Sequence, residues 1–414
     1  MIDVKLNAVQ VLAISAFGVV LGRWLNRIIP VLDRLNIPAA ITGGLVYAVA
    51  TLILRGRWMN FEMDLVLRDI LMVGFFTTIG MSASMDLIRR GGPDALRFFA
   101  MSTVGAVLQN IVGIAAAVAV GLNPLLGIIG GSVALTGGPA TALAFGSTFE
   151  GFGIQGATTL GVASAMFGIT TGGLMGGYIG GWLIRRHGLK STARPTGRTH
   201  GEELAAVFAH KPPKEVAVME EDPPEPVALT ETVIAIAIAM GVGTLISNGI
   251  QSLGLTLPAY VGAMIAAAVL RNIDDRYKFL GISQRTVDDV GNLSLYVFIV
   301  MALLTLRLWE LAHLAAPMFV LLVSQAVLAW FMCVVMSYRV MGRDYESAVM
   351  AGGFCGFMMG TTANAMACMD VLVRKYGPAP RAFIVVPLVG AFLIDFTNAL
   401  VIVNMTDLVR KFMP

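Results

Sequence analysis

Apolar runs long enough to cross a bilayer as helices, which takes about twenty residues each, recur along this chain of 414 residues. Charged residues make up only 13% of the sequence, against about a quarter in soluble proteins. A soluble monomer of this composition would expose large apolar patches. The net charge of +3 gives no basic field for nucleic acid. The sequence therefore predicts an all-α integral membrane protein and excludes a soluble enzyme, a disordered chain and a nucleic-acid binder.

One polar stretch, residues 185–228, divides the apolar part of the chain into two halves. It contains six prolines, seven basic residues and seven acidic residues, a composition typical of a flexible aqueous linker. We therefore expect an N-terminal membrane repeat over 1–184, a polar linker over 185–228 and a C-terminal membrane repeat over 229–414.

The two halves carry traces of an internal repeat. A shift of 222 residues aligns small-residue landmarks in the same order: Ser102 with Ser324, Gly138 with Gly360, and Gly168 with Gly390. Each half is predicted to hold five transmembrane helices and one glycine-rich element. The expected helices cover 6–28, 37–54, 70–86, 96–120 and 157–184 in the first half, and 229–250, 257–270, 290–306, 314–337 and 382–404 in the second.

The glycine-rich element of each half, at about 124–149 and about 346–370, does not suit a lipid-facing helix. Backbone that turns inside a membrane must be buried in protein, and glycine permits such turns. We therefore expect two re-entrant hairpins, each of which enters and leaves the membrane on one side.

The distribution of Lys and Arg predicts the orientation. With five crossings per half, the two repeats are inverted relative to each other, and the linker lies opposite both termini. If the linker is inside, the inside segments carry 22 Lys and Arg residues and the outside segments carry seven, as the preference of basic residues for the cytoplasm requires. We expect a multi-pass protein of the bacterial inner membrane, with a cytoplasmic linker and both termini periplasmic.

Inverted repeats with broken elements near the midplane are typical of secondary transporters. The sequence contains neither a nucleotide-binding Gly-Lys-Ser/Thr loop nor a His-Glu-x-x-His pair. We predict a transporter rather than an enzyme, with no catalytic residues and no cofactor apart from a co-transported ion. A passive channel and a membrane hydrolase stay open as remote alternatives.

The expected hairpin tips, 131–141 and 356–364, expose backbone groups that lipid does not satisfy. N–H groups at the start of a half-helix favour a carboxylate, whereas carbonyls and hydroxyls favour Na⁺. The candidate substrate-binding residues lie in these tips and in the last helix: Thr136, Gly137, Gly138, Thr141, Gly360, Thr361, Thr362, Asn364, Asp395 and Asn398.

Asp395 is an acid well inside an apolar helix, and Asn398 shares its helical face. An acid at that depth needs a cationic partner, a proton or water. We expect Asp395 to meet Na⁺, a proton or the ammonium of a substrate. The Na⁺ candidates are this acid and polar residues that interrupt other apolar helices: Asn110, Asn292, Ser294 and Asp395.

Several stretches of the chain resemble one known family. Leu67-Arg-Asp-Ile-Leu-Met72, Gln109-Asn110 and above all Val386-Pro-Leu-Val-Gly-Ala-Phe-Leu-Ile-Asp395 are similar to bacterial sodium/glutamate symporters of the glutamate:Na⁺ symporter family. The resemblance implies Na⁺-coupled uptake of L-glutamate by a homodimer. It also implies an elevator-type movement, in which a transport domain carries the hairpins past a static scaffold. The first tip departs from the family pattern, because Pro139 and Ala140 stand where the family has His and Gly.

The predicted function is Na⁺-coupled uptake of L-glutamate or a closely related acidic amino acid by alternating access. The alternative is a Na⁺- or H⁺-coupled di- or tricarboxylate symporter. Asp395 separates the two, because an acid repels a substrate that has only carboxylates. The expected partners are a small anionic amino acid, Na⁺, the lipid bilayer and a second copy of the chain, with no nucleic acid.

Overall fold

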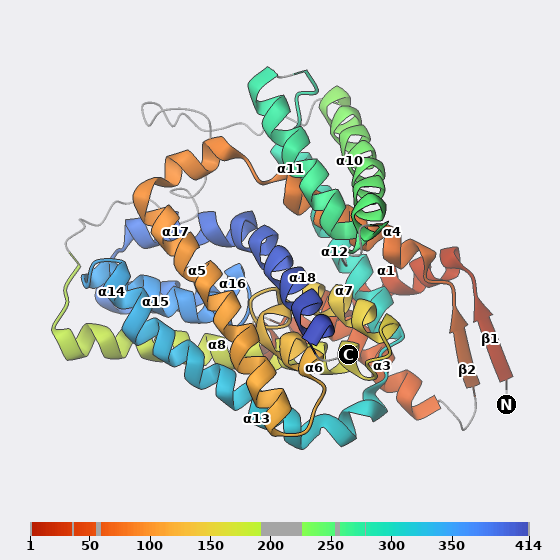
Figure 1. The fold of residues 1–414 in the computed structure, drawn as a ribbon, viewed down its shortest axis with the longest axis horizontal. Coiled ribbons are helices and arrows are strands. Elements are labelled where there is room, and N and C mark those ends of the chain that lie inside the picture. The colour runs from red at the N-terminus through yellow and green to blue at the C-terminus, as the bar shows by residue number, and fades with distance from the viewer. Residues whose placement is uncertain are drawn as a thin grey trace.

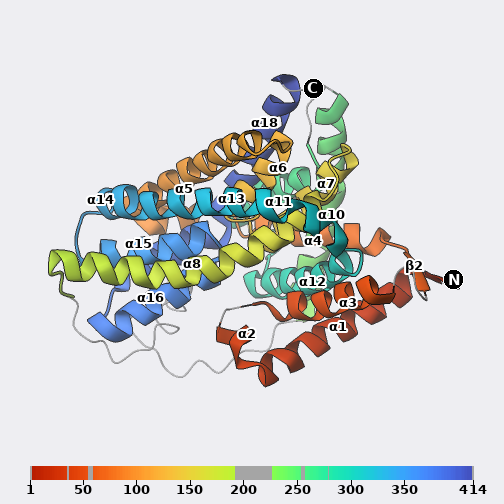
Figure 2. The ribbon, with the colours of Figure 1, turned by 90° about the horizontal axis from the view of Figure 1, so that it is seen from below.

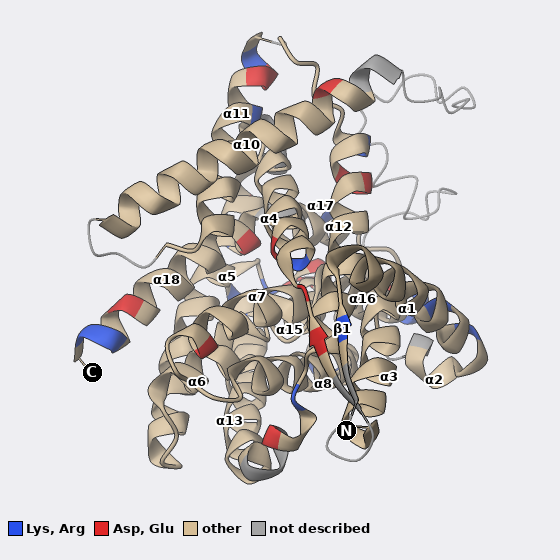
Figure 3. Ribbon diagram, turned by 90° about the vertical axis from the view of Figure 1, so that its right-hand side faces the viewer, with Lys and Arg blue, Asp and Glu red and all other residues tan. Residues whose placement is uncertain are grey.

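The computed structural model describes residues 2–34, 37–54, 59–191, 226–252, 257–277 and 279–412. Helices dominate this part of the chain (Figure 1). Most of the expected linker, residues 192–225, lies outside the described residues. Six described helices are long and apolar enough to cross a membrane: Ala8–Ile28, Gly92–Ala119, Ala157–His187, Leu229–Ser252, Gln284–Leu304 and Leu314–Val340. Figure 3 shows charged residues as sparse patches on mostly uncharged helices, as expected for a chain that sits in a bilayer.

The elements of the N-terminal half follow the predicted order of helices. They are β1 (Ile2–Leu6), α1 (Ala8–Ile28), α2 (Pro30–Arg34), α3 (Ala39–Leu54), β2 (Met59–Met63), α4 (Val66–Met81), α5 (Met85–Ala119), α6 (Pro124–Ile128), η1 (Ile129–Val133), α7 (Gly138–Gly151) and α8 (Ala157–His187).

The C-terminal half contains a similar succession. Its elements are α10 (Pro226–Ser252), α11 (Ala259–Tyr277), α12 (Gln284–Leu304), η2 (Leu308–Glu310), α13 (Leu311–Phe331), η3 (Met332–Ser337), α14 (Tyr338–Val340), α15 (Tyr345–Met358), α16 (Thr362–Tyr376), α17 (Pro380–Leu388), η4 (Val389–Leu393) and α18 (Ile394–Phe412).

Both glycine-rich elements fold as helical hairpins. Hairpin 1 comprises α6, η1 and α7, and its first leg widens at Gly131, whose backbone is not helical (φ −93°, ψ −126°). Hairpin 2 comprises α15 and α16, joined by a short turn at 359–361. The predicted end of hairpin 2, at about residue 370, is too early, because α16 continues to Tyr376.

The helices pack as two groups that are visible in Figures 1 and 2. The first three long helices of each half pack chiefly against one another, and we name them the α12 group: α1, α3, α4, α10, α11 and α12. The remaining helices pack with the two hairpins and form the hairpin group: α5, α8, α13, α17 and α18. Each half therefore contributes to both groups.

Within the hairpin group, the last long helix of each half lies against the hairpin of the other half. α8 packs along both legs of hairpin 2, and α18 packs against α5, α6 and η1. Glycine permits the first of these approaches, since a Cβ on Gly176 would lie 2.5 Å from the backbone oxygen of Gly352. The two halves are thereby interlocked.

Two local features differ from the all-helical expectation. β1 and β2 pair in parallel from Ile2 opposite Met59 to Leu6 opposite Met63. Both segments alternate apolar and polar residues with the period of a strand, and Lys5 Nζ lies 3.1 Å from Glu62 Oε2. In addition, α5 begins at Met85 rather than near residue 96, but Gly92 (φ 64°, ψ −165°) is not helical, so a short helical segment precedes the long helix that begins at Pro93.

Candidate functional site

A cavity of about 270 Å³ lies where the hairpin tips meet the α12 group. This volume is near the lower end of the range for small-molecule pockets, about 300–1,000 Å³. The lining residues come from both hairpins, from the turn before α18 and from the α12 group: Pro38, Phe75, Thr136, Gly137, Pro139, Ala140, Asn292, Leu295, Tyr296, Ile299, Phe357, Gly360, Thr361, Thr362, Gly390 and Asp395.

The two hairpin tips touch each other at this cavity. Gly138 has a positive φ of 69°, and a Cβ there would lie 3.6 Å from the Gly360 oxygen. On hairpin 2, Thr361 caps α16 by accepting a hydrogen bond from Asn364 N (3.4 Å), and Thr362 Oγ1 donates to Gly390 O (2.7 Å). The second tip is thus fixed both to its own helix and to η4.

Two helix N-termini converge on the cavity, because α7 begins at Gly138 and α16 begins at Thr362. Both helices are more than three turns long, and a helix start carries partial positive charge and N–H groups without intrahelical partners. An anionic group in the cavity is therefore stabilised from both hairpins.

Asp395 supplies the opposite charge. It lies at the start of α18, is half-buried, and is the one charged residue among the described residues that line the cavity. The preceding wide turn η4, which follows Pro387, interrupts the regular helix just before this acid. Asn292 of α12 lines the same cavity from the other helix group. The cavity therefore presents separate sites for an anionic and a cationic group.

Gln109 of α5 forms hydrogen bonds with both hairpins next to their tips. Its amide donates to Met358 O (2.6 Å) and accepts from Thr136 Oγ1 (2.5 Å). Gln325 of α13 in turn donates to Gln109 O (2.7 Å). A single buried side chain thus joins hairpin 1 to hairpin 2.

A second polar cluster surrounds Ser132 in the wide turn of hairpin 1. Asn110 Oδ1 accepts from Ser132 N (3.1 Å), and Asn398 Nδ2 donates to Ser132 O (3.0 Å). All three residues are fully buried, yet Ser132 Oγ, Asn398 Oδ1 and the donor Asn110 Nδ2 have no hydrogen-bond partner. Buried polar atoms are normally satisfied, so these two oxygens are suited to a cation.

Most of the predicted site residues lie either at the hairpin-tip cavity or in the Ser132 cluster. The cavity brings together Thr136, Gly137, Gly360, Thr361, Thr362, Asn292 and Asp395, with Gly138 beside it at the tip contact. Asn110 and Asn398 belong to the Ser132 cluster.

Three predicted residues point elsewhere. Thr141 is buried inside hairpin 1 against Gly137, and Asn364 is buried and donates to Ile169 O of α8 (2.7 Å). Ser294 faces α4, where its hydroxyl lies 3.6 Å from a Cβ placed on Gly74.

Sequence reasoning did not single out Ser132, Gln325 and Tyr296 as site residues. The signal for Gln325 was available, because it is a lone amide in the apolar run 314–337. Ser132 and Tyr296 carry no comparable signal, since a serine in a glycine-rich turn and a tyrosine in an apolar helix are common packing residues. Their positions became evident only from the packing of η1 and α12.

A multi-pass helical protein whose two hairpin tips enclose a small cavity that holds a few polar groups has the architecture of a secondary transporter. The profile of the "Sodium/glutamate symporter" family matches residues 4–378. The chain is 37% identical over 402 residues to the sodium/glutamate symporters of Escherichia coli (strain K12) and Shigella flexneri, covering 96% of both chains. It is 33% identical over 394 residues to that of Haemophilus influenzae, covering 94% of this chain and 95% of the relative.

The chain therefore belongs to the sodium/glutamate symporter family. The resemblance noted from the motifs is confirmed. Membership also makes the protein a multi-pass membrane transporter rather than an enzyme.

Proposed function

We propose that this protein takes up L-glutamate, or a closely related acidic amino acid, together with Na⁺ by alternating access. The observation that carries the proposal is the cavity at which two helix N-termini face a single carboxylate. The names of the relatives and of the family agree with it.

The charges of the cavity suit an anionic amino acid. The carboxylates of the substrate lie at the starts of α7 and α16, where N–H groups of the tips and the Thr361 hydroxyl donate. The substrate ammonium then lies at Asp395, which balances its charge in a setting of low polarity. This arrangement uses Thr361 as a hydroxyl donor to the substrate, whereas Thr136 and Thr362 line the substrate site with hydroxyls that already donate to Gln109 Oε1 and Gly390 O.

Na⁺ binds, in this proposal, at the Ser132 cluster, through Ser132 Oγ and Asn398 Oδ1. Those oxygens are buried without partners, and hydroxyl and carbonyl oxygens at interrupted helices are the ligands of Na⁺ in such transporters. In this proposal, a second Na⁺ binds to Asn292 and Asp395 within the cavity. Because Ser132 belongs to the same hairpin as the first tip, ion binding orders the substrate site, which provides the coupling.

The movement in this proposal is a displacement of the hairpin group along the α12 group. The two groups pack densely within themselves and sparsely against each other, as expected of a transport domain and a scaffold. The proposal retains two inverted repeats, over 1–184 and 229–414, with re-entrant hairpins and a cytoplasmic linker over 185–228. It also retains periplasmic termini, the inner membrane and a homodimer.

A di- or tricarboxylate symporter is the competing function. Within the described lining of the cavity, no Lys or Arg offsets Asp395, so a substrate that has only carboxylates meets an uncompensated repulsion. The geometry therefore favours an amino acid.

The test is uptake into proteoliposomes with an imposed Na⁺ gradient, using labelled glutamate and a competing panel of aspartate, glutamine, malate and citrate. We expect Na⁺-dependent accumulation against the gradient, competed by acidic amino acids. Preferential competition by malate or citrate would establish the alternative function. Downhill flux without coupling to Na⁺ would establish a channel.

A further inference from the structure

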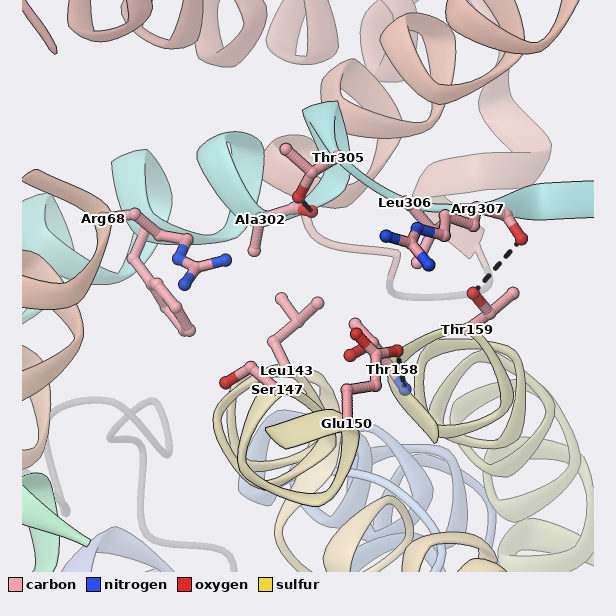
Figure 4. Close-up of a pocket in the computed structure, with 11 residues that line it drawn as sticks. Arg68, Leu143, Ser147, Glu150, Thr158, Thr159, Ala302, Thr305, Leu306 and Arg307 are labelled. Atoms are coloured by element: carbon pink, nitrogen blue, oxygen red, sulfur yellow. Dashed lines mark hydrogen bonds between the residues drawn. The ribbon is translucent and has the colours of Figure 1, made fainter. Parts of the chain in front are cut away.

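A second and smaller cavity lies further along the interface between hairpin 1 and α12 (Figure 4). Ser147 of α7 lines it, whereas Ala140 of the same helix lines the hairpin-tip cavity. On α12, Leu295 lines the hairpin-tip cavity and Ala302 lines the second cavity, so the residue numbers increase in the same direction as on α7. Between these pairs the step is seven residues, or about 10 Å at the helical rise, and the two linings adjoin on α12, where Ile299 lines the first cavity and Phe298 the second. The two cavities are thus successive positions along one path.

Two arginines face this second cavity from the side of the α12 group: Arg68 of α4 and Arg307 of the segment after α12. Figure 4 shows the guanidinium groups of Arg68 and Arg307 pointing into the same space from opposite sides. Arg68 Nη2 lies 2.7 Å from Asp69 Oδ1, and Arg307 Nη1 lies 3.3 Å from Glu310 Oε1. A guanidinium has five N–H donors, so one neighbouring carboxylate leaves each arginine with donors for another anion.

The opposite wall belongs to the hairpin group and holds a carboxylate of its own. Glu150 of α7 points into the cavity, and its Oε1 accepts from Thr158 N (3.0 Å). Thr158 Oγ1 is buried without a partner. The space that remains is about 40 Å³, enough for one or two waters and too small for an amino acid.

We propose that Arg68 and Arg307 form an anion-binding half-site, which receives the side-chain carboxylate of the substrate when the hairpin group has moved toward them. The inference rests on the proposed function. A displacement of about 10 Å along α12 brings the tip residue Ala140 to the present level of Ser147. The same displacement carries Glu150 beyond the arginines and opens the space that its side chain now occupies.

The half-site supplies a selectivity that the hairpin-tip cavity lacks. In the described state, the α12 group offers that cavity no cation. At the Arg68 end, α4 and the segment after α12 offer two, and an arginine pair distinguishes a carboxylate from an amide. Glutamate is therefore selected over glutamine mainly on the face where the arginines lie, which the proposed orientation makes the periplasmic face.

The test compares Arg68→Gln and Arg307→Gln with the unmodified protein in right-side-out and inside-out membrane vesicles. We expect the KM for glutamate measured from the arginine face to rise at least about tenfold in Arg68→Gln, as loss of a partly buried charge contact predicts, and by less in Arg307→Gln, because the Arg307 side chain is 60% exposed. The KM for glutamine from that face, and the KM for glutamate from the other face, stay within about twofold of the unmodified values, because neither involves the arginines. Arg68→Lys keeps the charge and is expected to recover part of the affinity.

Arg374→Gln is the matched control, because it removes the same charge from an exposed pair with Asp370 (3.0 Å) on hairpin 2, outside both cavities. Monodispersity in detergent checks that each variant folds, and the Lys variant keeps the test decisive if a Gln variant does not fold. Equal KM changes for glutamate and glutamine, or no change from the arginine face, overturn the half-site while leaving glutamate transport in place. Absence of Na⁺-dependent glutamate uptake by the unmodified protein overturns the proposed function itself.

Discussion

Thr136 and Met358 meet at the hairpin tips, with Thr136 Oγ1 3.7 Å from Met358 Sδ, although 222 residues separate them in the chain. The same offset relates Gly138 to Gly360, which also approach each other. Equivalent positions of two repeats touch each other only close to the axis that relates the repeats. Contacts of this kind are expected if an inverted repeat has its axis between the tips, and the inversion itself stays a prediction.

Thr136→Val is expected to destabilise the tips. The substitution keeps the shape of the side chain but removes the donor to Gln109 Oε1, and an orphaned buried acceptor costs about 1–3 kcal/mol. The midpoint of thermal unfolding in detergent measures the loss. Thr103→Val is the control, since that hydroxyl bonds only Phe99 O of its own helix. Equal midpoints for the two variants would argue against the Gln109 link.

Asp395→Asn is expected to lower Na⁺-dependent glutamate uptake at least about tenfold while the protein still folds, because an intramembrane acid is retained for its charge. Uptake into proteoliposomes measures the first effect and size-exclusion chromatography the second. Asp370→Asn, which removes a carboxylate from a surface pair with Arg374, serves as the control. Normal coupled uptake by Asp395→Asn would refute the role given to this acid.

Ser132→Ala is expected to raise the Na⁺ concentration for half-maximal uptake by about tenfold, the effect of losing one polar contact of ordinary strength. Folding stability should change little, because the hydroxyl has no protein partner to lose. Ser102→Ala is the buried control, since its hydroxyl bonds Phe98 O within α5. An unchanged Na⁺ dependence would place the ion elsewhere.

Gly176→Ala and Gly177→Ala test the interlocking of the two halves. A methyl group on Gly176 would lie 2.5 Å from Gly352 O, whereas one on Gly177 meets nothing within 4 Å. Overpacking of this kind costs about 1–3 kcal/mol, while alanine in an open helical position gains up to about 1 kcal/mol. Thermal midpoints in detergent should therefore move in opposite directions. A shift of the same sign for both would contradict the close approach of α8 and α15.

Much of the fold follows from local patterns in the sequence. Apolar runs locate the long helices, and glycine clusters locate both hairpins, because a bilayer leaves few alternatives for such segments. The division into two packing groups has no local signal. It depends on which helix faces meet, and contacts such as that between Gly80 of α4 and Met264 O of α11 become visible only in three dimensions.

The candidate site was predictable in its chemistry but not in its grouping. Thr136, Thr361 and Asp395 were all singled out, and they do line one cavity. Asn292 and Ser294 were both predicted as Na⁺ candidates, yet residues two positions apart on a helix point to different faces, and only Asn292 reaches the cavity. Asn398 is one turn from Asp395 but bonds Ser132 instead, because α18 is enclosed by different neighbours along its length.

The interlocked packing of the two halves also determines the order in which the hairpins meet their packing partners while the chain is synthesised. The first leg of hairpin 1 lies against α18 (Ile394–Phe412), which is synthesised long after it. Hairpin 2 lies against α8, which is synthesised long before it. The polar turn of hairpin 1 therefore stays incompletely covered until α18 has been synthesised. Hairpin 2 finds its partner already in place, so the two structurally similar hairpins mature by different routes.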